Sequence, residues 1–141
     1  MSIFTHFTHL AADGDFKVRG NAEGFARLME LGTVLYSATS GQAATLHTLP
    51  KDAILLEIIC DVTEAFNSGS SDVLTIGAGD DADAIMAADD ITEGTIGTYR
   101  KDAWAIGDAV GTAITATLTK SGTAATKGKA IIYGLIVDRI E

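Results

Sequence analysis

The sequence predicts an all-β protein, a β-sandwich with a jelly-roll-like arrangement as one option and one short helical segment. Three observations support this class: side chains alternate at a period of two, glycine-rich turns separate the runs, and long amphipathic helices are missing from the pattern. The 141 residues include fifteen glycines and one proline, so glycine shapes the turns. We expect roughly eight or nine strands, forming one domain over residues 21–141 behind an N-terminal arm or edge strand over residues 1–20.

The first third of the chain has the weaker patterns. "SIFTHFTHL" (2–10) fits an extended arm, and "DFKVRG" (15–20) fits a short strand. "EGFARLMELG" (23–32) stays open between helix and strand, because its apolar residues have helical spacing but the segment is short. "TVLYSATSGQAATLHTLP" (33–50) predicts two strands around a Ser-Gly-Gln turn.

The middle of the chain predicts a hairpin followed by the helical segment. Ala53 to Thr63 alternates with a clean apolar face, and Asp72 to Gly77 is a second strand behind the turn "NSGSS". We predict that these two strands pair with each other. The alanine-rich stretch 81–90 predicts one or two helical turns, and residues 93–100 predict another short strand or arm.

The last third predicts a C-terminal hairpin. Val110 to Thr119 places aliphatic residues at even positions and mostly threonines at odd ones, as in a half-buried strand. Ala130 to Ile140 is apolar on both faces at its centre, which predicts a central strand covered on both sides. The loop between them is rich in glycine and longer than two residues.

Charge and hydropathy exclude several classes of partner. The formal net charge is −9, from 19 acidic and 10 basic residues. Such a chain lacks the basic surface that phosphate contacts need, so we expect neither direct nucleic-acid binding nor adsorption to anionic lipid. No window approaches the ~20 apolar residues of a membrane helix. The first fifteen residues lack a basic stretch followed by an apolar one, so we expect synthesis in a host cytoplasm without a cleaved leader.

A cluster of acidic residues is the first candidate for chemistry. Its members are Asp80, Asp81, Asp83, Asp89, Asp90 and Glu93. Carboxylates can ligate Ca²⁺, but the spacing lacks the calcium-loop pattern and its glycine, and an exposed acidic loop is the preferred interpretation. A glycosidase pair would need a sugar cleft, for which three tyrosines and one tryptophan offer few platforms. Whether the 80–93 loop binds Ca²⁺ at a subunit contact stays open.

The remaining candidates are isolated. His6 and His9 point to opposite sides of a strand, so they chelate one ion only if the segment is helical. Cys60 lies in an apolar run and is expected to be a small core residue. Trp104 is either a surface anchor at an interface or a core residue. We therefore expect no catalytic residue, metal site or cofactor, and no enzymatic activity.

Two stretches resemble small virion structural proteins of tailed bacteriophages. The first, "LHTLPKDAILLEIICDVTEAFNSGSSDVLTIGAGDDADAI" (Leu46 to Ile85), has a strand after "LP" that ends in a "V-T-x-A-F-N" run, then an "L-T-I-G" strand and an Asp/Ala-rich loop. The second, "ITATLTKSGTAATKGKAIIYGLIV" (Ile114 to Val137), is similar to their last hairpin. Together they cover about half of the chain.

The resemblance implies a β-sandwich that assembles as a homo-oligomer, with a trimer favoured, on the surface of a virion. The leading role is capsid decoration, in which the protein binds the major capsid protein and stabilises contacts between shell subunits. Phe4, His6 and Phe7 in the arm, together with Trp104, are the candidate interface residues. The alternative is a tail, neck or head-fibre component that binds a receptor or a glycan.

Overall fold

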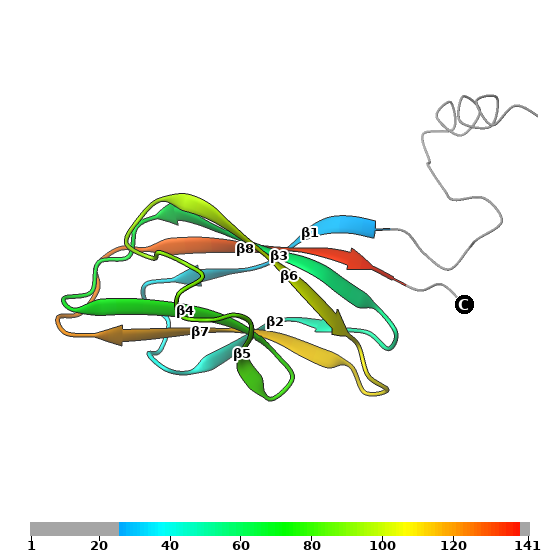
Figure 1. Cartoon of the computed structure of the whole chain (residues 1–141). Coiled ribbons are helices and arrows are strands. Elements are labelled where there is room, and N and C mark those ends of the chain that lie inside the picture. Colours follow the sequence, from blue (N-terminus) through cyan, green and yellow to red (C-terminus); the bar gives the residue numbers. More distant parts are fainter. Residues whose placement is uncertain (1–25, 139–141) are drawn as a thin grey trace, which may run out of the picture.

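The computed structural model describes residues 26–138 as two four-stranded sheets packed face to face, with every ladder antiparallel (Figure 1). The strands are β1 (Ala26–Leu35), β2 (Ala43–Leu49), β3 (Ile54–Glu64), β4 (Ser71–Ala78), β5 (Asp81–Met86), β6 (Gly97–Ile106), β7 (Thr112–Ser121) and β8 (Lys129–Val137). No helix long and apolar enough to cross a membrane occurs in this range. The predicted arm over residues 1–20 lies outside the described residues.

The strands pair as a long hairpin rolled into a sandwich. β1 pairs with β8, β2 with β7, β3 with β6, and β4 with β5. The ladders β3–β8 and β4–β7 complete a first sheet of order β1-β8-β3-β6 and a second of order β2-β7-β4-β5. This nested order is a jelly roll, the double sheet built from two Greek keys. The predicted β-sandwich is therefore confirmed, in its jelly-roll form.

Both predicted hairpins are wrong. β3 and β4 lie in opposite sheets, and so do β7 and β8. Residues 65–70 and 122–128 therefore cross from one sheet to the other instead of closing a tight turn. Alternation indicates which side chains face the interior. It is the same for a strand that pairs with the next strand in the sequence and for one that is followed by a crossing to the other sheet, so it does not identify the partner. The sequence pattern thus predicts the strands without their partners.

The predicted helical segment at 81–90 is also wrong, because residues 81–86 form β5. A tight turn containing Gly79, with a positive φ of 62°, joins β4 to β5 and pairs Ala78 with Asp81. Ile85 and Met86 are then buried in the core. Burial of these two side chains between the sheets outweighs the helix propensity of the neighbouring alanines. The ambiguous segment 23–32 likewise contributes a strand, since β1 begins at Ala26.

The core lies between the two sheets and consists of their inward-facing aliphatic residues. The largest side chains among those that are fully buried include Leu55, Ile58, Leu74, Ile76, Ile114, Leu118, Ile132 and Ile136. On β3 the even positions Ile58, Cys60 and Val62 are buried as the alternation predicts, but before the register shift between Leu55 and Glu57 it is Leu55 that faces the core, so the prediction is wrong for Ile54 and Leu56. On β7 Ile114, Ala116 and Leu118 are buried, whereas Val110 precedes the strand and is 90% exposed. Gly134 makes room for this packing, because a Cβ there would lie 2.9 Å from side-chain atoms of Leu31 and Leu55.

β8 agrees with its prediction on the inner face and differs from it on the outer face. It is central, between β1 and β3, and Ala130, Ile132 and Ile136 on its inner face are buried as expected. The outer face carries Ile131, Tyr133, Leu135 and Val137, which are half-buried. No described strand packs over this outer face, so the prediction that β8 is covered on both sides is wrong for residues 26–138.

Candidate interaction surfaces

Trp104 lies on β6, at the edge of the first sheet. Its side chain is 69% exposed, which settles the choice between surface and core in favour of the surface. Ala103 and Ala105, on either side, pack against the core, so the tryptophan projects away from it. The register shifts here between Leu55 and Glu57 of β3, and Trp104 takes a positive φ of 52°. A local bulge in a left-handed backbone conformation therefore presents this side chain to solvent.

Other apolar residues surround this position on the outer side of the first sheet. One row of the ladder joins four of them: Ala26, Val137, Ile54 and Ile106. The next row joins Leu28 to Leu135 and continues through Glu57 to Asp102. Leu28 is 60% and Ile106 56% exposed. We call six of these residues the apolar face: Leu28, Ile54, Trp104, Ile106, Leu135 and Val137.

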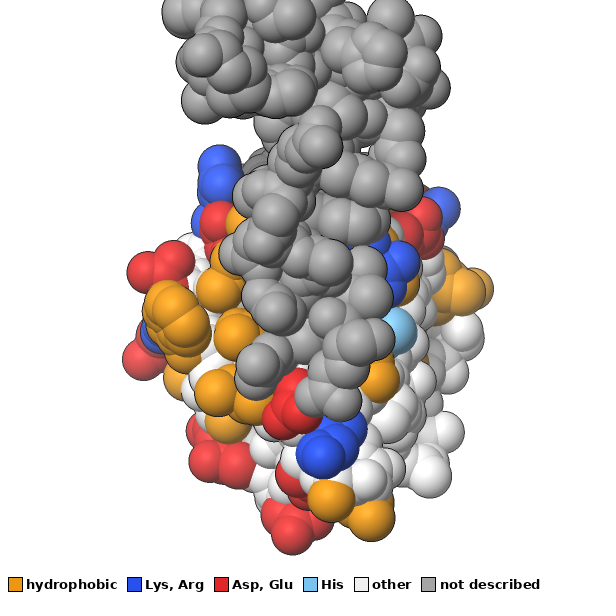
Figure 2. Space-filling view, turned by 90° about the vertical axis from the view of Figure 1, so that its right-hand side faces the viewer, with side chains coloured by type: hydrophobic (Ala, Val, Ile, Leu, Met, Phe, Trp, Pro, Cys, Tyr) orange, Lys and Arg blue, Asp and Glu red, His pale blue; other side chains and the backbone are white. Residues whose placement is uncertain are grey.

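The apolar face lies at the end of the sandwich where β1 begins and β8 ends (Figure 1). Figure 2 is directed at this end, and hydrophobic side chains gather toward its left side. Sequence reasoning singled out Trp104 but missed Leu28 and Ile106. The only indication in the sequence is that the stretch from Ala130 to Ile140 is apolar on both faces at its centre.

The acidic cluster does not form one site, because its members lie in separate turns. Asp80, Asp81 and Asp83 are exposed around the β4–β5 turn. A hydrogen bond with Asp81, together with its charge, raises the pKa of Asp83 above its usual value. This part of the surface is therefore crowded with like charges that destabilise one another.

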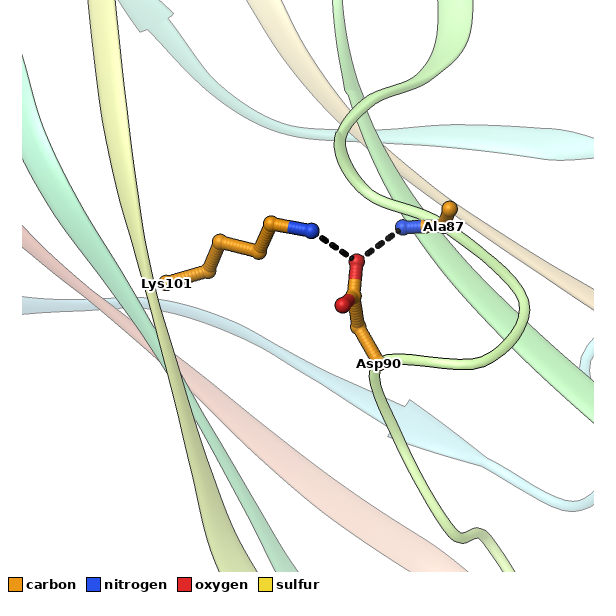
Figure 3. Close-up of polar contacts among 3 residues, drawn as sticks. All are labelled: Ala87, Asp90 and Lys101. Atoms are coloured by element: carbon orange, nitrogen blue, oxygen red, sulfur yellow. Dashed lines mark hydrogen bonds and ion pairs between the residues drawn. The ribbon is translucent and has the colours of Figure 1, made fainter.

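Asp90 has a local structural role. Its Oδ2 accepts hydrogen bonds from the backbone N–H of Ala87, at 2.8 Å, and from Nζ of Lys101, at 2.5 Å (Figure 3). The bond to Lys101, followed by the one from Ala87, holds the pKa of this carboxyl below its usual value. The contacts tie the 87–96 loop to the edge strand β6.

Glu93 lies apart from the other acidic residues of the cluster, in the interior of the domain. It is 7% exposed, and its Oε1 accepts a hydrogen bond from the backbone N–H of Leu74 at 2.6 Å. Its own carbonyl accepts from the N–H of Phe66 at 2.9 Å. Burial raises the pKa of the Glu93 carboxyl. The residue therefore anchors its loop to β4 and to the β3–β4 connection.

The remaining titratable candidates do not converge either. Burial raises the pKa of the Cys60 thiol to about 12, with the charges of Glu93 and Asp61 adding to the effect, so the thiolate is suppressed at neutral pH. Glu57 pairs with Arg100 at 2.6 Å, which lowers the carboxyl pKa. Among residues 26–138, no group of three or more His, Cys, Asp or Glu side chains could hold a metal ion. Phe4, His6, Phe7 and His9 lie outside the described residues.

Residues 26–138 thus form an eight-stranded jelly roll with a group of apolar side chains on the outer side of its first sheet. A scan against protein-family models finds no matching family, and a search of curated proteins finds no match. Two solved structures have the same fold. One is a chain of the cyanophage Pam1 capsid asymmetric unit, with a TM-score of 0.62 and 17% identity over 92% of this chain and 96% of that one.

The other is a chain of the capsid of Ralstonia phage GP4. It has a TM-score of 0.52 and 16% identity over 89% of this chain and 90% of that one. At 17% and 16% identity, the similarity shows that the folds are alike. The resemblance to phage virion proteins noted in the sequence is therefore confirmed at the level of the jelly roll.

Proposed function

We propose that this chain is a non-enzymatic structural protein of a phage virion, and that it decorates the outer surface of the capsid. The likeness to chains of two phage capsid structures carries the proposal, because it extends over nearly the whole of this chain and of both others. A match of this extent concerns an entire small domain, rather than a sheet shared with a larger protein.

In this role the protein acts as a cement. It binds the major capsid protein as a homo-oligomer, with a trimer favoured, and adds buried area between neighbouring shell subunits. The segment with Phe4, His6 and Phe7 supplies a docking arm that adds a strand to a neighbouring sheet. The net charge of −9 keeps many copies soluble at high local concentration.

The proposed absence of catalysis is supported by where the perturbed groups lie. Cys60 is buried in the core and Glu93 at its margin, whereas Glu57 and Asp90 are neutralised by Arg100 and Lys101. An active site needs such groups to converge on one pocket. Here Cys60 and Glu57 lie on opposite sides of β3, and Asp90 and Glu93 lie in the loop between β5 and β6.

The test is binding of purified protein to phage heads that lack it. Deleting residues 2–12 is expected to abolish binding, because the arm supplies the docking strand, and to leave the circular dichroism and the melting transition of the domain unchanged. Co-sedimentation with the heads measures the bound fraction.

A full-length variant carrying Phe4→Ser and Phe7→Ser should lose binding in the same way, whereas the matched control with Thr5→Ser and Thr8→Ser should keep it. Undiminished occupancy after the deletion rejects the arm as the docking element. Binding of the intact protein to tails and not to heads rejects decoration in favour of the tail or neck alternative.

A further inference from the structure

We propose that residues 87–96, here called the strap, close one side of the sandwich and open as the pH rises, because Glu93 must ionise inside the domain. The opening is local: the strap leaves β4 and the β3–β4 connection while the two sheets keep their strand pairing. The strap belongs to a single chain, so its test succeeds or fails independently of capsid binding.

The strap lies between the two edge strands on one side of the molecule. β6 is at the edge of the first sheet and β5 at the edge of the second, and the two strands are in contact. The strap runs from the end of β5 at Met86 to the start of β6 at Gly97. Ile91 and Glu93 are its buried residues, 3% and 7% exposed, and the rest is exposed apart from the half-buried Asp90. A segment with so few buried contacts can open without unfolding of the core.

Polar contacts hold the strap to both sheets. On the β6 side, Asp90 pairs with Lys101 (Figure 3), and the hydroxyl of Tyr99 donates to the carbonyl of Thr92 at 3.1 Å. On the β4 side, the side chain and the carbonyl of Glu93 accept the two backbone N–H groups described above. The polar attachment to β4 and to the β3–β4 connection therefore depends on Glu93.

Glu93 is a buried acid without a basic partner. No ion pair joins it to a basic side chain among residues 26–138. Asp72 of β4 and Cys60 of β3 face it, since the charge of Asp72 acts on Glu93 and the charge of Glu93 acts on Cys60. The 65–70 connection carries no charged residue. A buried charge without a counter-ion is unfavourable, so burial raises the pKa of the Glu93 carboxyl, and Asp72 adds to this effect.

The direction of the pH effect follows from linkage. In the open state Glu93 is in water and titrates near its ordinary pKa of 4.5, whereas the closed state holds the proton to a higher pH. Closure is therefore favoured most at or below this value, and each further pH unit favours opening about tenfold until the raised pKa is reached. Asp90 has a lowered pKa and stays ionised, so its pair with Lys101 is constant over this range.

Cys60 reports on opening, because it is the only cysteine, is fully buried and lies near Glu93. A thiol buried in this way reacts with dithiodipyridine only when the strap is open. The labelling rate is measured for the full-length wild type and for Glu93→Gln, which keeps an acceptor and cannot ionise, at pH values from about 4 to 8. Dividing one rate by the other removes the pH dependence of the thiol itself. The ratio of wild type to variant should rise by about tenfold per pH unit and then become constant.

Two further variants control for other causes. Glu30→Gln changes an exposed acid of β1 and should label like the wild type at every pH. Asp72→Asn removes the like charge that faces Glu93, so its labelling rate divided by that of the wild type should fall as the pH rises. This variant retains the ionisable Glu93, so it tests the strap even if Glu93→Gln fails to fold.

Hydrogen exchange distinguishes local opening from global unfolding. Relative to Glu93→Gln at the same pH, the N–H groups of Phe66 and Leu74 should exchange faster in the wild type as the pH rises. The N–H of Gly41, which donates to the carbonyl of Leu118 at 2.9 Å, should not. A labelling ratio that is constant with pH overturns the proposal. So does equal acceleration at Gly41, faster labelling of Glu93→Gln than of the wild type at every pH, or a thiol that stays unreactive throughout.

Discussion

At the scale of single residues, the surroundings of Trp104 and Glu93 decide whether each side chain is exposed or buried, and the residue type alone does not. A left-handed backbone at a bulky residue such as Trp104 costs on the order of 1–3 kcal/mol, and it presents the side chain to solvent instead of to the core. Glu93 shows the opposite outcome, because a charged residue type is directed inward and holds a backbone N–H. Both are candidates for substitution, and Glu93 gives the sharper stability test.

Replacing Glu93 by alanine should lower the free energy of unfolding by about 1–3 kcal/mol, because the buried N–H of Leu74 loses its acceptor. Glu93→Gln retains an acceptor and cannot ionise. The raised pKa of Glu93 means that its contribution is complete below the unfolded pKa and is lost as the pH rises through the folded value.

The stability of Glu93→Gln relative to the wild type should therefore increase as the pH is raised from about 4 to 7. Urea unfolding at several pH values measures this difference. A difference that stays constant or falls over the range would show that Glu93 is not held protonated by burial. Equal stability of the alanine and glutamine variants would argue against the bond to Leu74.

Sequence reasoning at this scale succeeded where burial follows residue type. Cys60 was predicted as a core residue and is buried. The sequence is less informative where long-range contacts determine burial. Its pattern groups Glu93 with the exposed acidic residues and does not indicate that Leu28 is exposed. Nothing in a local window states that a carboxylate will meet the N–H of a strand nineteen residues away, because that contact depends on how the strands assemble.

At the scale of elements, alternation predicted strands well and their partners poorly. The buried residues of β8 follow the period of two along the whole strand, since one side of it faces the opposite sheet. In β3 the alternation is interrupted where the register shifts between Leu55 and Glu57, and in β7 Thr115 is buried between Ile114 and Ala116. Pairing depends on which connections turn back and which cross the sandwich. β5 shows the limit most clearly: its alanines favour a helix, but the tight turn after β4 and burial of Met86 make it a strand.

The β4–β5 turn can be tested through Gly77. A Cβ at this position would overlap the carbonyl oxygen of Asp81 and the backbone of Ala82, which fold back over it. Gly77→Ala should therefore lower the free energy of unfolding by about 1–3 kcal/mol, as overpacking against rigid backbone does. Denaturant unfolding measures the change.

Gly94 provides the matched control, because a Cβ there has no neighbour within 4 Å. Gly94→Ala should change stability by less than about 0.5 kcal/mol. If Gly77→Ala were equally harmless, the backbone of β5 would not lie against Gly77, and the assignment of residues 81–86 to a strand would need revision.

At the scale of the whole molecule, the nested strand order is what connects the chain to its proposed role. The jelly roll was one option from the sequence and became definite only with the ladders β1–β8, β2–β7, β3–β6 and β4–β5. Its first sheet carries apolar side chains such as Leu28, Trp104 and Ile106 on the outer side, beside Glu57 and Asp102. A protein of net charge −9 with such a surface is suited to repeated contacts in a symmetric assembly.

The most direct measurement is an electron cryo-microscopy reconstruction of the intact particle that contains this protein. The expected result is jelly-roll density in symmetric groups on the outer surface of the head. Density for this chain in the tail or neck, or its absence from the head, would contradict the account.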